Sequence, residues 1–484
     1  MDEVAFAPAT ELVAAIDRKE ISSVELLDAF VARIDKHNPA INAVVALDLD
    51  RARAACRAAD DELARGHRRG PLHGLPMTIK DSIETEGVVT TSGAPNLAGH
   101  VPVTDADAVA RLKAAGAIVF GKTNLPIYAG DCQTYNEVYG TTNNPWNLDR
   151  TPGGSSGGSA AALAAGLTGF ELGSDIGGSI RNPAHLCGVF GLKPTYGIVP
   201  GRGHIPGPPG MLSEPDVASL GPLGRSTGDL ALGLDVLAAA PPDRAVAWHL
   251  ELPPPRRSAL ADYRLTAWLD DAAAPVDAAV LDALTTALDG LRGAGAAIDE
   301  DPVPVSLADA SELFEQLVFT VTGSSIPEPL FEAACAVEAT PRADDEPAPT
   351  RSARAVAMRH RTWARLNEAR HRQRAGWAEF FGSHDAVLAP VMQTAAFPHT
   401  HEGNLFARTL TVNGEARPYV DTLRWCGAFG VVYLPAAVVP IGLTADGLPV
   451  GLQIVGPYLQ DRTVLDIAGR IEQALGGFRS PPGY

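Results

Sequence analysis

The sequence predicts one α/β domain built on a mixed β-sheet with helices on both sides. Residues 75–121 alternate between strand, helix and strand patterns, which is typical of such a sheet. The chain has 484 residues, of which 46% are hydrophobic and 20% charged, so it can bury a large core. We expect a helical layer over residues 1–66, the core of the domain over 67–240 and 376–484, and a variable helical insertion over 241–375.

The individual elements follow in order along the chain. Residues 10–65 have a helical pattern throughout, and Ser22 with Glu25 forms a capping box. Apolar side chains alternate with others over residues 75–79, which predicts a half-buried strand that sends Lys80 to its less apolar face. Further helices are expected at 106–115, 160–167, 229–240, 351–377 and 462–475, and further strands at 117–121, 385–390, 434–441 and 448–456.

Charge and cysteine content narrow the class of protein. The chain has 39 basic and 57 acidic residues, and its net charge of −18 disfavours nucleic acid as a partner. Its five scattered cysteines form no C-x-x-C pair, so we expect neither a disulfide framework nor a zinc site, and a reducing cytoplasm fits best. The acidic N-terminus lacks the features of a secretory signal. Glycines and prolines interrupt the uncharged stretch Trp425–Leu443, which we interpret as buried strand and loop.

Three short patterns match known motifs but lack the surroundings that those motifs require. Gly116–Thr123 fits the P-loop expression, yet its middle residues are strand-like and a proline follows where a helix should begin. Gly153–Gly157 fits the nucleophile elbow of α/β-hydrolases, yet loop residues precede it. His399 and His401, with Glu402, have no third histidine placed by a motif. We therefore expect no metal and no nucleotide or other cofactor.

The most informative stretch is Thr151–Arg181, which carries Ser155 and Ser179 on either side of an alanine-rich run. Glycines beside each serine permit unusual backbone angles and let several N–H groups converge on one point. The alanine-rich run predicts a helix that packs closely, whereas a flexible Gly/Ser linker would contain no such helix. We expect both serines to lie on loops at the ends of regular elements.

Four motifs together resemble the amidase signature family of serine hydrolases, and they are GLPMTIKD at 74–81, GGSSGGS at 153–159, GSDIGGSIRNP at 173–183 and GLKPTYG at 191–197. The resemblance covers residues 10–240 and 385–475. One departure is Glu171, where the family more often has a small residue, and we expect it to affect packing or pocket entry. The segment 200–211 is more similar to the fatty acid amide hydrolase and general amidase branches than to the A subunits of glutamyl-tRNA amidotransferases.

The resemblance implies hydrolysis of carboxylic amides through a serine acyl-enzyme. It makes Ser179 the nucleophile, Ser155 a bridging serine that follows a cis peptide bond, and Lys80 the base. A lysine can act as a base only if its pKa falls well below about 10.4, which burial achieves. Lys80 is the one lysine of six for which we expect a buried setting, whereas Lys122 and Lys193 are expected to be solvated or structural.

The resemblance also assigns the groups around the nucleophile. The oxyanion hole is expected to consist of the backbone N–H groups of Ile176, Gly177, Gly178 and Ser179. Asp175 and Arg181 flank this loop with opposite charges, and we expect them to hold it rigid.

Six mostly apolar or aromatic residues in segments beside the catalytic loops are expected to line the substrate pocket, and they are Tyr128, Tyr135, Ile205, Met211, Trp425 and Phe429. Such a pocket favours hydrophobic acyl or aryl amides, with esters or carbamates as side substrates. The alternative function is that of the glutamine-hydrolysing A subunit in an aminoacyl-tRNA amidotransferase complex. The expected partners are a small amide and water, with no nucleic acid and no membrane span, and a homodimer is left open.

Overall fold

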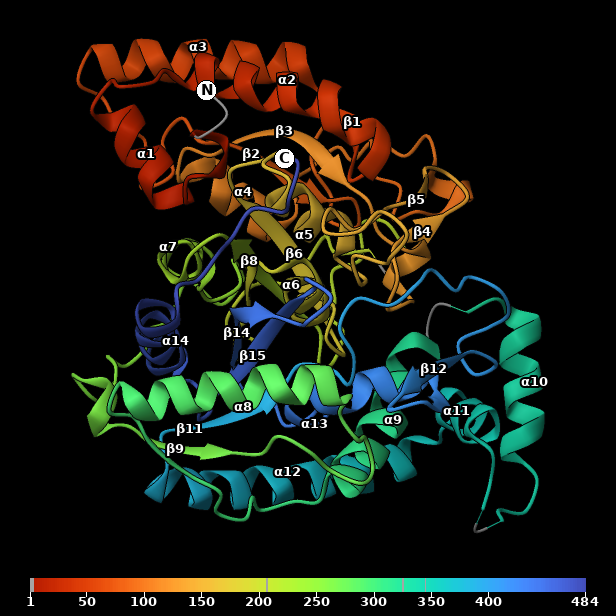
Figure 1. Cartoon of the computed structure of the whole chain (residues 1–484). Helices are drawn as coiled ribbons and strands as arrows, with labels where there is room; N and C mark the ends of the chain where they lie inside the picture. Colours follow the sequence, from red (N-terminus) through yellow and green to blue (C-terminus); the bar gives the residue numbers. More distant parts are fainter. Residues whose placement is uncertain (1–3, 206–207, 324–325, 344) are drawn as a thin grey trace.

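An 11-stranded mixed sheet runs through the computed structural model, which describes residues 4–205, 208–323, 326–343 and 345–484 (Figure 1). Within these residues the strand order is β1-β3-β2-β6-β8-β7-β14-β15-β11-β9-β10. The strands of this sheet are β1 (Val44–Leu47), β2 (Pro76–Lys80), β3 (Ile118–Thr123), β6 (Glu171–Asp175), β7 (Phe190–Lys193), β8 (Ser219–Gly224), β9 (Arg264–Ala267), β10 (Ala297–Asp299), β11 (Ala386–Pro390), β14 (Ala436–Leu443) and β15 (Pro449–Val455). Two short pairs lie outside it, β4 (Tyr135–Asn136) with β5 (Gly140–Thr141) and β12 (Thr409–Val412) with β13 (Glu415–Pro418). The predicted mixed α/β sheet is confirmed.

Helices surround this sheet, as the sequence predicted (Figure 1). They are α1 (Ala9–Asp17), α2 (Ser23–Ile41), α3 (Leu49–Ala64), α4 (Asp107–Ala114), α5 (Gly157–Ala164), α6 (Arg181–Cys187), α7 (Thr227–Leu237), α8 (Ala278–Gly293), α9 (Leu307–Gly323), α10 (Glu328–Glu338), α11 (Ala348–Val356), α12 (His360–Ser383), α13 (Arg424–Gly430) and α14 (Asp461–Leu475). In the described part of the chain, no helix is both long and apolar enough to cross a membrane.

The strand directions bring three carboxyl ends to one edge of the sheet. Strand β2 runs parallel to β3 and β6, and its Thr78 pairs with Glu171. Strands β6 and β7 are each antiparallel to β8, so they run in the same direction as each other. Lys80, Asp175 and Lys193, the last residues of β2, β6 and β7, therefore lie along the same edge.

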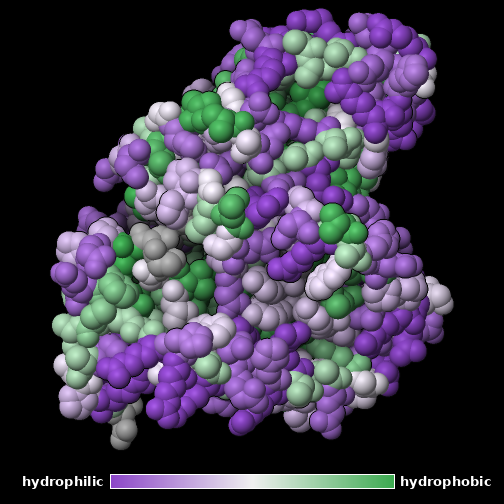
Figure 2. Space-filling view, turned by 180° about the vertical axis from the view of Figure 1, so that it is seen from behind, coloured by the Kyte–Doolittle hydropathy of each residue, from purple (hydrophilic) through white to green (hydrophobic). Residues whose placement is uncertain are grey.

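The N-terminal helices form a layer at one end of the molecule, and seen from behind its outer faces are predominantly hydrophilic (Figures 1 and 2). The capping box of Ser22 and Glu25 at the start of α2 is confirmed. The prediction of helix throughout residues 10–65 is wrong at β1, which pairs antiparallel with β3. Asn42 ends α2 in the left-handed conformation at φ 56°, and the Asn38 side chain bonds the backbone of Ala43 and Val44. This turn allows β1 to pair with the edge of β3 that β2 leaves free.

The sheet is more deeply covered than the sequence pattern suggested. All five residues of β2 are buried, so the prediction of a half-buried strand is wrong. This strand lies between β3 and β6 and contacts both α2 and α5, which accounts for the burial of its polar residues. The alanine-rich helix α5 is buried along its whole length, and this agrees with the predicted close packing.

The C-terminal half differs from prediction in three places. The segment 241–375 supplies helices and also β9 and β10, which extend the central sheet. The helix predicted over 351–377 is divided into α11 and α12. The stretch Trp425–Leu443, predicted as strand and loop, begins with the buried helix α13 before β14. A short apolar run does not distinguish a buried helix from a buried strand by periodicity, which explains the last error.

Candidate active site

A completely buried lysine at the end of β2 is the centre of the site. The Nζ of Lys80 lies within hydrogen-bond distance of the hydroxyls of Ser155 at 2.7 Å, Ser174 at 2.9 Å and Ser156 at 3.0 Å. Burial lowers the pKa of Lys80 to about 7, although the carboxyls of Asp175 and Glu171 act in the opposite direction. A substantial fraction of Lys80 is therefore uncharged near neutral pH, as the sequence analysis required of a base.

The loop that carries Ser155 fits its surroundings only with glycine beside the serine. The peptide bond between Gly154 and Ser155 is cis. A Cβ atom at Gly154 would lie 2.6 Å from the carbonyl oxygen of Asp131 and 2.7 Å from the backbone of Cys132. The Ser156 N–H donates to the carbonyl of Ser179 at 3.0 Å. The two serine loops predicted from the sequence are therefore in direct backbone contact.

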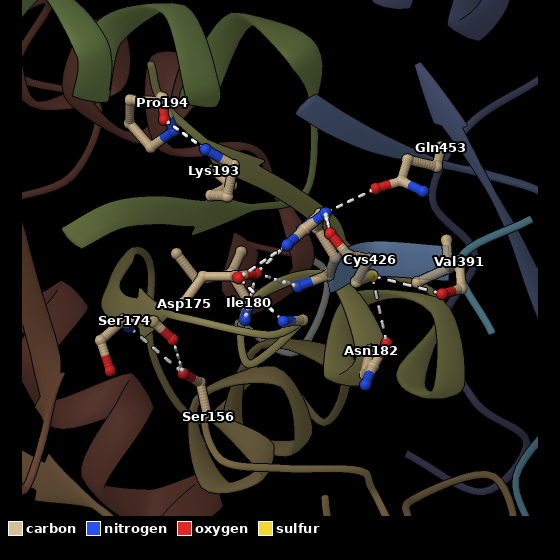
Figure 3. Close-up of polar contacts among 12 residues, drawn as sticks. Ser156, Ser174, Asp175, Ile180, Asn182, Lys193, Pro194, Val391, Cys426 and Gln453 are labelled. Atoms are coloured by element: carbon tan, nitrogen blue, oxygen red, sulfur yellow. Dashed lines mark hydrogen bonds and ion pairs between the residues drawn. The ribbon is translucent and has the colours of Figure 1, made fainter. Parts of the chain in front are cut away.

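The loop between β6 and α6 is organised by one buried carboxylate (Figure 3). Asp175 accepts hydrogen bonds from the backbone N–H groups of Gly178 at 2.8 Å, Ile180 at 3.1 Å and Arg181 at 3.3 Å. The Arg181 guanidinium also donates to it, at 3.0 Å from Nε and 2.8 Å from Nη2. Burial by itself raises the pKa of Asp175, but the charge and hydrogen bonds of Arg181 outweigh it and lower the pKa to about 2. The predicted ion pair of Asp175 and Arg181 is confirmed.

This network changes the expected set of oxyanion donors. The Gly178 N–H is engaged by Asp175, so it does not point freely toward a substrate as the sequence analysis expected. The N–H groups of Ile176, Gly177 and Ser179 remain as candidates. Ser179 and Ile176 are partly exposed, whereas the rest of residues 171–183 is buried. Ser179 is therefore the serine of this group that a substrate can reach.

The six expected pocket residues have different surroundings. Trp425 and Phe429 are completely buried and pack on Trp268, and the Trp425 indole donates to the carbonyl of Ala274 at 3.0 Å. Helix α13 directs both side chains to the buried Trp268 cluster, and their part in a substrate pocket stays a prediction.

The other four expected pocket residues have separate surroundings. The Tyr135 hydroxyl donates to Asp131, and the Tyr128 hydroxyl donates to Asn96. Ile205 is buried with its backbone bonded to Ser82 and Ser92, and Met211 is half-buried.

A cavity beside Gly177 was not expected. A Cβ atom at Gly177 would lie 2.8 Å from the Phe314 ring, and one at Gly427 would lie 2.6 Å from the same ring, so Phe314 is close to both glycines. The cavity is small, about 10 Å³, and is lined by Ser311, Phe314, Glu315, Val318, Phe319, Ala348, Phe406, Val420, Leu423 and Arg424. Most of these residues come from α9 and from the segment around the short helix η5 (Tyr419–Leu423). No sequence motif marks them, because only the tertiary fold brings α9 to the catalytic loop.

Lys80 is not the one buried lysine that the sequence analysis expected. Lys122 is also completely buried and donates to the carbonyl of Ile83 and to Thr85, and Lys193 is buried and donates to the carbonyl of Pro194 at 2.8 Å. Burial lowers the pKa of Lys122 to about 8 and that of Lys193 to about 7. Their bonds to carbonyls agree with a structural role, whereas the alternative expectation of a solvated role is wrong.

The structure also shows where the P-loop-like pattern, the two late histidines and Glu171 lie. Residues 118–123 of the P-loop-like pattern form strand β3, which leaves no phosphate-binding loop there. His401 stacks on Tyr135 at 3.8 Å between ring centroids, and neither His399 nor His401 joins a three-ligand cluster among the described residues. The Glu171 carboxyl is buried and accepts hydrogen bonds from Thr78 and Thr123, and burial raises its pKa to about 8.

The family model for Amidase matches residues 25–465. The chain belongs to the amidase signature family. It is 37% identical to the A subunit of glutamyl-tRNA(Gln) amidotransferase from Roseiflexus sp. (strain RS-1), over 94% of this chain and 93% of that protein. It is 33% identical to indoleacetamide hydrolase of Bradyrhizobium diazoefficiens, over 97% and 86% of the two chains.

The fold of this amidase is shared with solved structures of the family. The structure of 6-aminohexanoate cyclic dimer hydrolase complexed with substrate matches with a TM-score of 0.78 and 27% identity, over 99% of each chain. The relatives thus include one component of an amidotransferase as well as amide hydrolases. The overall similarity does not reproduce the preference for the general amidase branch that we drew from residues 200–211.

Proposed function

We propose that this amidase hydrolyses carboxylic amides through an acyl-enzyme formed on Ser179. The observation that carries the proposal is the buried Lys80 amine, whose Nζ lies 2.7 Å from the Ser155 hydroxyl and whose pKa is lowered to about 7 by burial. A serine hydroxyl becomes a useful nucleophile when a base accepts its proton. Uncharged Lys80 has a lone pair for that proton, and Ser155 is the group through which it passes.

The reaction follows in two halves. The Ser179 Oγ attacks the amide carbonyl while its proton passes through Ser155 to Lys80. The N–H groups of Ile176, Gly177 and Ser179 are the donors for the developing oxyanion, and one such donor contributes about 3 kcal/mol. The same proton then returns through Ser155 to the leaving amine. Water hydrolyses the acyl-enzyme by the reverse use of the same groups and releases the carboxylic acid.

The apolar surface beside Gly177 supports a hydrophobic acyl or aryl group as the part of the substrate next to the carbonyl. Phe314, Val318, Phe319, Phe406 and Leu423 give the small cavity there a largely apolar wall. Its two charged residues already form ion pairs with the protein, Arg424 with Asp421 at 2.7 Å and Glu315 with Arg351 at 3.1 Å. Burying a polar amino acid side chain without matched partners costs a few kcal/mol. Esters and carbamates of the same acyl groups are proposed as side substrates.

The second candidate is glutamine hydrolysis as the A subunit of an amidotransferase complex. Its support is the 37% identity to the A subunit of a glutamyl-tRNA(Gln) amidotransferase. Glu315 and Arg424 carry opposite charges of the kind that a free amino acid pairs with, although each would have to exchange its present partner, Arg351 or Asp421, for the substrate. This function requires partner subunits, whereas the first candidate does not.

Two measurements on the isolated chain separate these functions. A fluorophosphonate probe should label Ser179, and Ser179→Ala should abolish both labelling and turnover while the unfolding midpoint is unchanged. The isolated wild type should cleave an aryl anilide with a higher kcat/KM than glutamine. Labelling of another residue with retained activity of Ser179→Ala would disprove the nucleophile assignment. A preference for glutamine, enhanced by partner subunits, would establish the second candidate.

A further inference from the structure

A second cavity, of about 560 Å³, lies between α12, the loop after β15 and the start of α14. It shares no lining residue with the cavity beside Gly177. Its walls are formed by Arg256, His371, Arg374, Ala375, Trp377, Ala378, Phe381, Val432, Leu434, Pro457, Tyr458 and Gln460. Three of these side chains are basic, and no aspartate or glutamate of the described chain is among them. On a chain with a net charge of −18, such a cavity is a local exception.

Two arginines one turn apart on α12 differ in whether a carboxylate of the protein neutralises their charge. Arg370 is buried, and its guanidinium forms a 2.7 Å ion pair with Asp216. Arg374 is half-buried and has no carboxylate partner among the described residues. Its guanidinium carbon lies 4.4 Å from the centroid of the Tyr458 ring and 5.0 Å from that of Tyr433. Stacking on these rings positions the Arg374 cation without neutralising it.

The other basic groups have different surroundings. Arg256 is largely satisfied, because it donates to the carbonyls of Phe381 and His384 and lies 3.5 Å from Asp385. His371, which also lines the cavity, is exposed. The unneutralised charge that a ligand would meet is therefore that of Arg374.

One residue of the cavity wall also has an unused hydrogen-bond donor. Trp377 is 1% exposed, and its indole Nε1 has no partner among the described residues. Buried indole N–H groups usually have a partner. Phe381, Val432 and Leu434 supply the adjoining apolar surface.

We propose that this cavity binds an organic anion with a flat apolar body, of the class of aryl carboxylates and aryl phosphate esters. The anionic group pairs with Arg374, and the ring packs on the apolar wall formed by Trp377, Phe381 and Leu434. Arg374 is well suited to either anion because its planar guanidinium can donate two parallel hydrogen bonds. The proposal is independent of the reaction at Ser179.

Isothermal titration calorimetry of the full chain tests it with three probes, namely 2-naphthoate, 2-naphthyl phosphate and the uncharged 2-naphthylmethanol. At least one anion should bind more tightly than the alcohol, and the preferred anion distinguishes a carboxylate from a phosphate ligand. Arg374→Gln should weaken anion binding by about tenfold, the effect of losing one charge-assisted contact. Arg372→Gln is the matched control, because Arg372 lies on the same helix, is 79% exposed and does not line the cavity. It should change affinity by less than about twofold.

A second variant tests the location without altering charge. Ala378 is exposed at the cavity wall, so Ala378→Trp should fold normally and occupy the space of the naphthyl ring. Unchanged unfolding midpoints of the ligand-free variants confirm that each remains folded. Loss of binding in both Arg374→Gln and Ala378→Trp supports the site. The proposal is overturned if neither anion binds, if the alcohol binds as tightly as the anions, or if these two variants bind as the wild type does.

Discussion

The loop between β6 and α6 is held by contacts between residues close together in the sequence, whereas the cavity beside it is formed by residues far away in the sequence. The loop is held by Asp175, which binds backbone groups three to six residues later and the side chain of Arg181. The cavity is built by Phe314 and its neighbours on α9, which approach Gly177 from a distant segment. On the function that we propose, the chemistry depends on a local motif, whereas the selectivity depends on how a remote helix packs. Substitutions in the two regions should accordingly have separable effects.

The largest effect is expected at the base. Lys80→Met keeps the length of the side chain but removes the amine, so turnover should fall by about 10⁴-fold, as loss of a catalytic group does elsewhere. Lys122→Met is the matched control, because Lys122 is equally buried but bonds to the carbonyl of Ile83 and to Thr85. Kinetics of both purified variants on one anilide provide the measurement. An equal loss of activity in both variants would show that activity requires any buried lysine in this region, rather than the specific contact of Lys80 with Ser155.

The next effect concerns the stability of the catalytic loop. Asp175→Asn removes one partner of a buried ion pair, which should lower the free energy of unfolding by about 3 kcal/mol at pH 7. The pKa of Asp175 is lowered in the folded protein to about 2, so its stabilising contribution is complete above the unfolded value near 4 and is lost as pH falls toward 2. Urea unfolding at several pH values should show this dependence in the wild type and its absence in the variant.

A more exposed ion pair supplies the control for Asp175. Asp107 bonds Arg202 at 2.7 Å, but their side chains are 16% and 29% exposed. Asp107→Asn should therefore cost less than about 1 kcal/mol. Similar losses of unfolding free energy in Asp175→Asn and Asp107→Asn would contradict the larger stabilisation that we assign to the buried Asp175–Arg181 pair.

The pH dependence of turnover should show a moderate effect. Burial lowers the pKa of Lys80 to about 7, so the amine is increasingly uncharged as pH rises through that value. With an uncharged substrate, kcat/KM should fall about tenfold per pH unit below the pKa and level off above it. A rate independent of pH between 5 and 8 would be inconsistent with Lys80 as the base.

Sequence reasoning succeeded where contacts are local. Glycines beside Ser155 and Ser179 indicated the two loops, and opposite charges six residues apart indicated the Asp175–Arg181 pair. It failed where a neighbouring element decides the outcome. Lys122 is buried because the strand that carries it lies inside the sheet, and no local pattern revealed that depth.

The pocket shows the same limitation more strongly. Trp425 and Phe429 have the composition of a pocket wall but pack on Trp268 in the core. Phe314 lies in a segment without a recognisable motif and yet contacts the catalytic loop. A single sequence contains no direct signal for either outcome, because both depend on which distant helix packs against α13 and Gly177.

The smallest effect is expected at Phe314, in the apolar wall that we propose to select the substrate. Phe314→Leu removes the ring beside Gly177 but keeps an apolar side chain, so kcat/KM for an aryl anilide should fall by about fivefold, as expected for the loss of about 1 kcal/mol of apolar contact. Acetamide carries only a methyl group beside its carbonyl, so Phe314→Leu should hydrolyse it at nearly the wild-type rate. Phe170→Leu is the control, because Phe170 is completely buried but does not line this cavity. It should lower stability without changing the ratio of the two activities. If Phe314→Leu lowered both activities equally, Phe314 would support the catalytic loop, and the separation between a local chemical motif and a remote selectivity wall would not hold.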